Sequence, residues 1–174
     1  MNRNNTSSVM EINYLKRRFW ILAILLFSIG LDQLSKYAVR FYITPMDYIP
    51  LVEDFFILTN VENTGAMLGL GQNLAPWLKI IWLQLLPVVM LLLFLYNILK
   101  KEHLDSKVIF AFALVIGGGI GNLIDRIVYG SVTDFFQLKM GVLKTGIFNM
   151  ADVAVTTGVL LIIMLSIRHK KMAF

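Results

Sequence analysis

Four long apolar segments constrain this 174-residue chain more than any other feature. They cover about residues 19–39, 77–99, 108–126 and 147–167, and each is close to the roughly 20 residues that a helix needs to cross a bilayer. Apolar side chains make up 57% of the chain and charged ones 16%, a composition outside the range of soluble domains. The sequence therefore predicts a single membrane domain, residues 1–174, of the all-α class with four transmembrane helices.

The segments outside the spans have different expected structures. Residues 1–14 are polar and are expected to form a flexible tail. The stretch from about 40 to 75 contains prolines and short, interrupted apolar runs, which predict a small external lobe with β-strands. Residues 128–146 form a second external loop. Within the second span, Pro87 is expected to kink the helix.

The start of the chain allows a second interpretation. Three basic residues, Lys16 to Arg18, precede the first apolar run, as they would in a secretory signal peptide. No small-residue cleavage site follows, because the run continues into Asp32 and Gln33. A retained membrane anchor is therefore the favoured interpretation.

The basic residues predict the orientation, because cytoplasmic flanks of membrane spans are enriched in Lys and Arg. Ten of the 16 basic residues fall on one side: Arg3, Lys16, Arg17, Arg18, Lys100, Lys101, Lys107, Arg168, Lys170 and Lys171. We expect that side, which includes both termini, to be cytoplasmic. The formal charge of +5 thus reflects span flanks and gives no reason to expect a nucleic-acid partner.

Two spacings predict contacts between or within helices. Gly117 and Gly121 form a small-xxx-small face on the third span, which permits close approach of another helix. Asp32 and Lys36 are separated by four residues in the first span, so that their side chains share one helix face and can form an ion pair.

Polar side chains gather at the outer end of the predicted bundle. Eight of the 11 acidic residues fall on the outer side. The cluster consists of Asp32, Asp125, Asp134, Asp152, Asn63, Asn122 and Asn149. Acidic side chains near hydrocarbon are costly unless paired or neutralised, so they are functional candidates.

Carboxyl groups that meet can perform acid–base chemistry. Two close carboxylates do not both ionise readily, so one acts as an acid and the other as a base. Such a pair can hydrolyse a peptide bond. The alternatives are a proton or ion transporter, a cation site and a structural subunit. Thiolate chemistry is excluded because the chain has no cysteine, and zinc is disfavoured because His103 and His169 fall on the inner side.

Five sequence blocks, in order from the first span to the fourth, resemble those of the bacterial lipoprotein signal peptidases, also called signal peptidase II. The blocks are Leu31–Lys36, Asn63–Ala66, Gly117–Arg126, Val132–Phe135 and Phe148–Asp152. The resemblance implies a membrane aspartyl endopeptidase that removes the signal peptide from diacylglyceryl-modified prolipoproteins, before the lipid-bearing cysteine. It implies action as a monomer in the bacterial cytoplasmic membrane, in contact with membrane lipid, with its site at the outer face and without metal or cofactor.

The same resemblance implies roles for individual residues. Asp134 and Asp152 would be the catalytic pair. The residues that would bind substrate or support the site are Asn63, Gly65, Asn122, Arg126, Asn149, Ala151, Asp125, Asp32 and Lys36. Met67 and Leu68 depart from the family, which usually has a small residue and an aromatic one there.

Asp125 competes with Asp134 for the catalytic role. Asp125 is adjacent to Arg126, so a local ion pair or hydrogen bonds would keep it ionised and structural. Asp134 lies among Val132, Phe135 and Phe136, apolar neighbours that can raise the pKa of a carboxyl group. Asp134 is therefore the preferred partner of Asp152.

Overall fold

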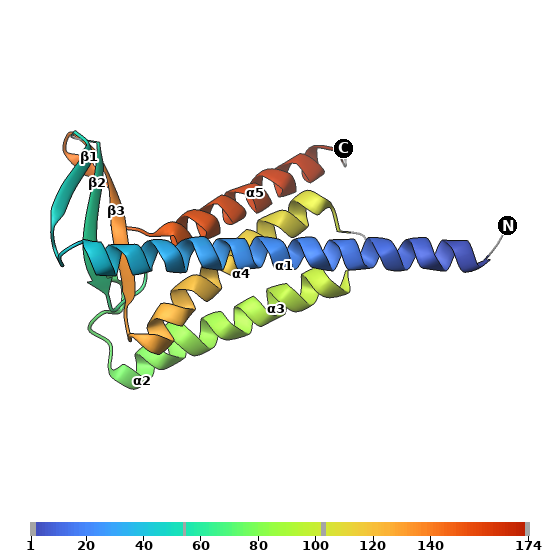
Figure 1. The fold of residues 1–174 in the computed structure, drawn as a ribbon, viewed down its shortest axis with the longest axis horizontal. Coiled ribbons are helices and arrows are strands. Elements are labelled where there is room, and N and C mark those ends of the chain that lie inside the picture. The colour runs from blue at the N-terminus through green and yellow to red at the C-terminus, as the bar shows by residue number, and fades with distance from the viewer. Residues whose placement is uncertain (1–2, 54, 102–103, 173–174) are drawn as a thin grey trace.

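The computed structural model describes residues 3–53, 55–101 and 104–172 as a helical bundle with a β-sheet at one end (Figure 1). The helices are α1 (Arg3–Tyr42), α2 (Pro76–Lys79), α3 (Leu86–Lys100), α4 (Ser106–Val128) and α5 (Met150–Met172). The strands are β1 (Tyr48–Val52), β2 (Phe56–Asn63), β3 (Val132–Met140) and β4 (Leu143–Lys144). Both chain ends lie at the end of the bundle opposite the sheet (Figure 1).

Within the described residues, four helical segments are long and apolar enough to cross a membrane, as predicted. They are Tyr14–Tyr42, Pro76–Lys100, Ser106–Val128 and Met150–Arg168. The predicted flexible tail is wrong, because α1 begins at Arg3 and continues through it without a break. Several charges used to predict orientation fall outside the described residues or side chains: Arg3, Glu11, Asp54, Glu102, Lys170 and Lys171.

The second span contains an irregular turn close to the expected kink. Residues Ile80–Leu85 form a π-helical turn between α2 and α3, just before Pro87. Proline supplies no backbone N–H and its ring crowds the preceding turn. A widened turn before it relieves that crowding and keeps the segment helical.

Helix α4 is central and contacts α1, α3 and α5. Its glycines make this close packing possible, as the small-xxx-small pattern predicted. A Cβ at Gly117 would lie 2.7 Å from Ser28 Cβ on α1, and one at Gly121 would lie 2.5 Å from Asp32 Oδ2. A Cβ at Gly118 would overlap the backbone of Ala151 on α5. Side chains at these positions would separate the helices that carry the polar cluster.

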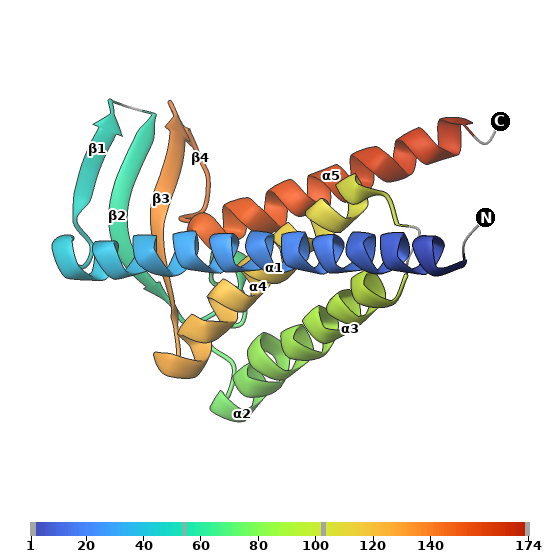
Figure 2. The ribbon, with the colours of Figure 1, turned by 45° about the vertical axis from the view of Figure 1, so that its right-hand side comes forward.

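The sheet is built from both external loops, and not from the first alone as predicted. Its strands follow the order β1-β2-β3-β4 and are antiparallel (Figure 2). In the β2–β3 pair, Asn63 faces Val132 and Val61 faces Asp134. The register shifts between Leu58 and Val61, and a bulge of this kind bends a strand locally. Pairing of β2 with β3 brings Asn63 and Asp134 to the same end of the bundle.

Candidate active site

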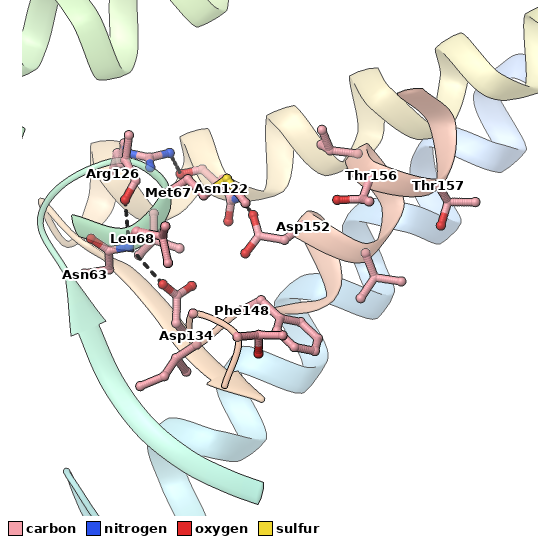
Figure 3. A pocket seen from close by; sticks show the side chains of 17 residues that line it. Asn63, Met67, Leu68, Asn122, Arg126, Asp134, Phe148, Asp152, Thr156 and Thr157 are labelled. Atoms are coloured by element: carbon pink, nitrogen blue, oxygen red, sulfur yellow. Dashed lines mark hydrogen bonds between the residues drawn. The ribbon is translucent and has the colours of Figure 1, made fainter. Parts of the chain in front are cut away.

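A cavity of about 520 Å³ lies where the sheet meets the bundle. Its charged and amide side chains are Asn63, Asn122, Arg126, Asp134 and Asp152 (Figure 3). Apolar walls come from the loop after β2, from the segment before α5 and from α5 itself. The cavity continues along α5 past residues 153 and 155–157, and those at 153, 156 and 157 are on the exposed surface of this candidate span.

The carboxyl groups of Asp134 and Asp152, here called the carboxyl pair, both face this cavity (Figure 3). Asp134 Oδ2 accepts a hydrogen bond from Asn63 Nδ2 at 2.9 Å, and its Oδ1 accepts one from Asn149 Nδ2 at 2.6 Å. Asp152 Oδ1 accepts a hydrogen bond from Asn122 Nδ2 at 2.8 Å. Three amides from three parts of the chain therefore orient the two carboxyl groups.

The start of α5 explains the spacing of Asn149 and Asp152. Asp152 N–H donates to Asn149 Oδ1 at 3.0 Å, and Asn149 N–H donates to Asp152 Oδ2 at 3.1 Å. This reciprocal pair satisfies backbone donors that have no partner within the helix. The same three-residue spacing thus begins the helix and directs Asp152 toward the cavity.

Burial changes the protonation of Asp134, which is only 5% exposed. Loss of solvent raises the pKa of its carboxyl group from 3.8 to about 6. The Asn63 hydrogen bond acts in the opposite direction, and the nearby charge of Asp152 raises the pKa further. Asp134 therefore keeps its proton to a higher pH than an ordinary aspartate, as its apolar neighbours predicted.

Behind the cavity lies a second group of charges, here called the support cluster: Asp32, Lys36, Arg40 and Asp125. The predicted ion pair is present, with Lys36 Nζ 2.8 Å from Asp32 Oδ2. Lys36 Nζ also lies 3.2 Å from Asp125 Oδ2, and Arg40 lies 2.8 Å from the same oxygen. The side chains of Asp32, Lys36 and Asp125 are fully buried. Buried charges of this kind require such compensation.

Asp125 was expected to be held by a local ion pair or by hydrogen bonds, and the structure shows hydrogen bonds together with cations of α1. Adjacent residues on an α-helix point about 100° apart, so Asp125 faces α1 while Arg126 faces the cavity. Arg126 donates to Gly65 O at 3.1 Å and to Asn122 O at 3.4 Å. Asp125 also accepts a hydrogen bond from Thr133 N–H at 3.2 Å, which ties α4 to the residue before Asp134.

The turn after β2 is closed by the Asn63 side chain. Gly65 N–H donates to Asn63 Oδ1 at 2.9 Å, which closes an Asx turn. A Cβ at Gly65 would lie 2.7 Å from backbone atoms of Gly69 and Leu70, so the turn requires glycine. Leu68 has a φ of 59°. Its side chain lies against Gly146, where an added Cβ would be 2.5 Å from Leu68 Cδ2.

The remaining predicted site residues have direct structural partners. Ala151 is fully buried, and its N–H donates to Asp32 Oδ1 at 2.9 Å, which links the support cluster to α5. Among the residues that the structure describes, no group of three His, Cys, Asp or Glu side chains is arranged to hold a metal ion. His103 and the His169 side chain lie outside that part.

Several partners were not anticipated from the sequence. Arg40 follows Lys36 by one helical turn, a spacing that could have identified it. Its Nε donates to Thr133 Oγ1 at 2.7 Å. Thr133 Oγ1 also donates to Glu62 on β2 at 2.8 Å. These contacts join segments far apart in the sequence, and no local pattern indicates them.

Comparison with known proteins agrees with this geometry. The model of the family described as signal peptidase (SPase) II matches residues 24–168. A lipoprotein signal peptidase of Clostridioides difficile strain 630 is 41% identical over 139 residues, which cover 80% of this chain and 88% of the relative. One from Caldanaerobacter subterraneus subsp. tengcongensis is 34% identical over 141 residues, covering 81% of this chain and 91% of that relative.

The fold comparison gives the same result. A solved bacterial membrane enzyme, determined by the in meso method at 2.3 Å, superposes with a TM-score of 0.78 at 27% identity. The match covers 86% of this chain and 88% of that chain. Together with the arrangement of the cavity, these similarities show that the chain belongs to the signal peptidase II family.

Proposed function

We propose that this aspartic endopeptidase cleaves diacylglyceryl-modified prolipoproteins at the bond before the lipid-bearing cysteine, with Asp134 and Asp152 as the catalytic pair. Cleavage of lipoprotein signal peptides is the activity named for its relatives. The observation that carries the residue assignment is the convergence of these two carboxyl groups, one from β3 and one from α5, on one cavity. Asp125, the competing acid, is fully buried against Lys36 and Arg40 instead.

The reaction begins with a water molecule between the two carboxyl groups. The ionised carboxylate takes a proton from the water, and the water oxygen attacks the scissile carbonyl carbon to form a tetrahedral intermediate with one hydroxyl group and one negatively charged oxygen. The protonated carboxyl group donates its proton to the leaving nitrogen as the C–N bond breaks. The products are a free carboxyl terminus on the signal peptide and a free amine on the lipidated cysteine.

Neighbouring polar groups would hold the substrate. Arg126 and Asn63 border the cavity beside the carboxyl pair and are suited to bind backbone carbonyl groups of the peptide. Asn122 and Asn149 orient the carboxyl groups. Gly65 allows the loop after β2 to pack tightly, and its carbonyl group accepts a hydrogen bond from Arg126.

The orientation follows the charge distribution. Described basic residues such as Lys16, Lys101 and Arg168 lie toward the end that holds both termini, opposite the sheet (Figure 1). Cytoplasmic flanks favour such residues, so the sheet and the cavity would lie at the outer face of the bacterial cytoplasmic membrane. All the proposed site residues come from one chain, which supports action as a monomer in contact with membrane lipid.

A cleavage assay in detergent micelles tests the proposal. The purified protein should cut a diacylglyceryl-modified precursor in the absence of any ion gradient and in the presence of a metal chelator. Asp134→Asn and Asp152→Asn should each reduce product formation at least about a hundredfold, and each variant should still unfold in one cooperative thermal transition. Asp47→Asn, the same change at an exposed position on the external lobe, is the matched control and should retain activity. Dependence on a gradient would favour the transporter alternative, and loss of activity with chelator would favour a metal site.

A further inference from the structure

The side chain of Asn122 connects the support cluster to the carboxyl pair. Its Oδ1 accepts a hydrogen bond from Lys36 Nζ at 2.9 Å and another from Asn149 Nδ2 at 3.1 Å. Its Nδ2 donates to Asp152 Oδ1 at 2.8 Å. One end of the amide therefore meets a buried cation, and the other end meets a proposed catalytic carboxyl group.

Lys36 determines which way this amide points. An ammonium group has three donors and no acceptor, so it can pair only with the oxygen of the amide. The reversed amide would place its NH₂ group against the ammonium group and its oxygen against Asp152. Lys36 is itself held by Asp32 and Asp125 and is fully buried, so it cannot turn away into solvent.

We infer that Lys36 is a positioning residue for the proposed cleavage. By holding Asn122 Oδ1, it commits the Asn122 NH₂ group to Asp152, which makes Asp152 the ionised base and leaves the proton on Asp134. This inference rests on the proposed function, and it assigns the two members of the carboxyl pair to different steps.

The surroundings of the two carboxyl groups support this assignment. Asp152 lies in the first turn of α5, where the helix dipole favours negative charge, and it accepts a second hydrogen bond from Asn149 N–H. Asp134 lies in the interior of the β2–β3 pair and is almost completely buried.

Other charged groups border Asp152 as well. The titratable or charged neighbours in the described elements are Asp134 on β3, Arg126 and Asp125 on α4, and Asp32 and Lys36 on α1. Of these, Arg126 interacts electrostatically with both Asp134 and Asp152. The charge of Lys36 also acts on Asp134. Among the described residues, however, Asn122 donates directly to Asp152 and is connected to Asp134 through Asn149, which donates to both Asn122 and Asp134.

The test is the pH dependence of kcat/KM in micelles, because its acid limb reports ionisation of the base in the free enzyme. In Lys36→Met the acid limb should move to higher pH by about one unit, and kcat should fall about tenfold with KM within twofold. Asn122→Leu removes the donor to Asp152 without adding a charge, so it should shift the acid limb in the same direction.

Arg40→Met is the matched control. It also removes a cation bound to Asp125, but the Arg40 side chain is bound to Asp125 and Thr133 and not to Asn122. This variant should lose thermal stability and keep the acid limb of the wild type. A purely structural role for Lys36 would make Lys36→Met behave in the same way as Arg40→Met.

Two outcomes would overturn the inference while the wild type still cleaves the lipidated precursor. One is an unmoved acid limb in Lys36→Met or Asn122→Leu. The other is an equal shift in Arg40→Met, which would indicate a general effect of charge. If Lys36→Met does not fold, Asn122→Leu decides the question. Absence of cleavage by the wild type would instead contradict the proposed function.

Discussion

The support cluster and the carboxyl pair contain the same residue type at the same end of the bundle, yet their surroundings differ. Asp32 and Asp125 each contact the Lys36 ammonium group and are fully buried. Asp134 and Asp152 accept hydrogen bonds from neutral amide groups and border a cavity. Direct contact with a buried cation commits an aspartate to an ion pair, whereas contact with neutral amide groups at the edge of a cavity leaves a carboxyl group open to substrate.

The two regions also depend on each other. Removing one member of a buried ion pair leaves an uncompensated charge, which is strongly destabilising. The support cluster therefore holds α1 against α4, and Ala151 and Asn122 transmit that position to the carboxyl pair. We expect the support cluster to determine stability and the carboxyl pair to determine turnover.

The largest expected effect is the loss of turnover in Asp134→Asn, which distinguishes the carboxyl pair from the support cluster. Asp134→Asn should lower kcat by about a hundred- to ten-thousandfold, because a general acid is lost. Asp125→Asn should destabilise the protein by about 3–5 kcal/mol, because Lys36 and Arg40 lose a shared carboxylate, while the folded fraction keeps kcat within about tenfold of wild type. Cleavage assays and thermal unfolding in detergent measure both. Near-normal turnover in Asp134→Asn together with an inactive Asp125→Asn would show that the pair is wrongly assigned.

The second expected effect is a pH dependence of stability. The pKa of Asp134 is raised in the folded protein, from 3.8 to about 6, so the folded state favours its neutral form. The stabilisation is complete below about pH 4 and is lost as pH rises through about 6, a change of about 3 kcal/mol. The unfolding midpoint of the wild type should fall relative to that of Asp134→Asn across this interval. Parallel midpoints at all pH values would contradict the burial of this carboxyl group.

The same raised pKa predicts the alkaline limb of activity. If Asp134 supplies the proton to the leaving nitrogen, kcat/KM should decline above about pH 6, by up to tenfold per pH unit. A profile that stays flat to pH 8 would assign the proton donor elsewhere.

The smallest expected effect concerns the packing that holds the two regions together. Gly121→Ala places a Cβ 2.5 Å from Asp32 Oδ2 and should cost about 1–3 kcal/mol of stability. Gly30→Ala on α1 is the matched control, because a Cβ there meets nothing within 4 Å. Thermal unfolding should show a loss for the first variant and no loss for the second. Equal midpoints would mean that α1 and α4 can separate freely at this point.

Local sequence patterns predicted the features that depend on one segment at a time. The apolar runs predicted the four spans, and the spacing of Asp32 and Lys36 predicted their ion pair. The glycines of α4 predicted the close helix contact. These features follow from helix periodicity. The helical start of α1 was missed because residues 3–13 are polar, and polarity alone does not distinguish an extended helix from a tail.

Features that join distant segments could not be predicted in the same way. The pairing of Asn63 with Val132 joins two loops separated by two spans, and no periodicity indicates which strands meet. For Asp125 the sequence left open a local ion pair or hydrogen bonds, and it did not indicate the contacts with Lys36 and Arg40 on α1. The position of Asp134 beside Asp152 depends both on the pairing of β2 with β3 and on the contact of Asp125 with α1.

The cavity continues along the exposed surface of α5, past Thr156 and Thr157. A substrate that enters there comes from the plane of the bilayer. Its effective concentration is then its mole fraction among the lipids, and not its concentration in the bulk solution. Turnover in vesicles would then follow the mole fraction of precursor among the lipids, and adding inert lipid at a constant amount of enzyme and precursor would slow the reaction. Inhibitors would compete according to how strongly they partition into the same leaflet.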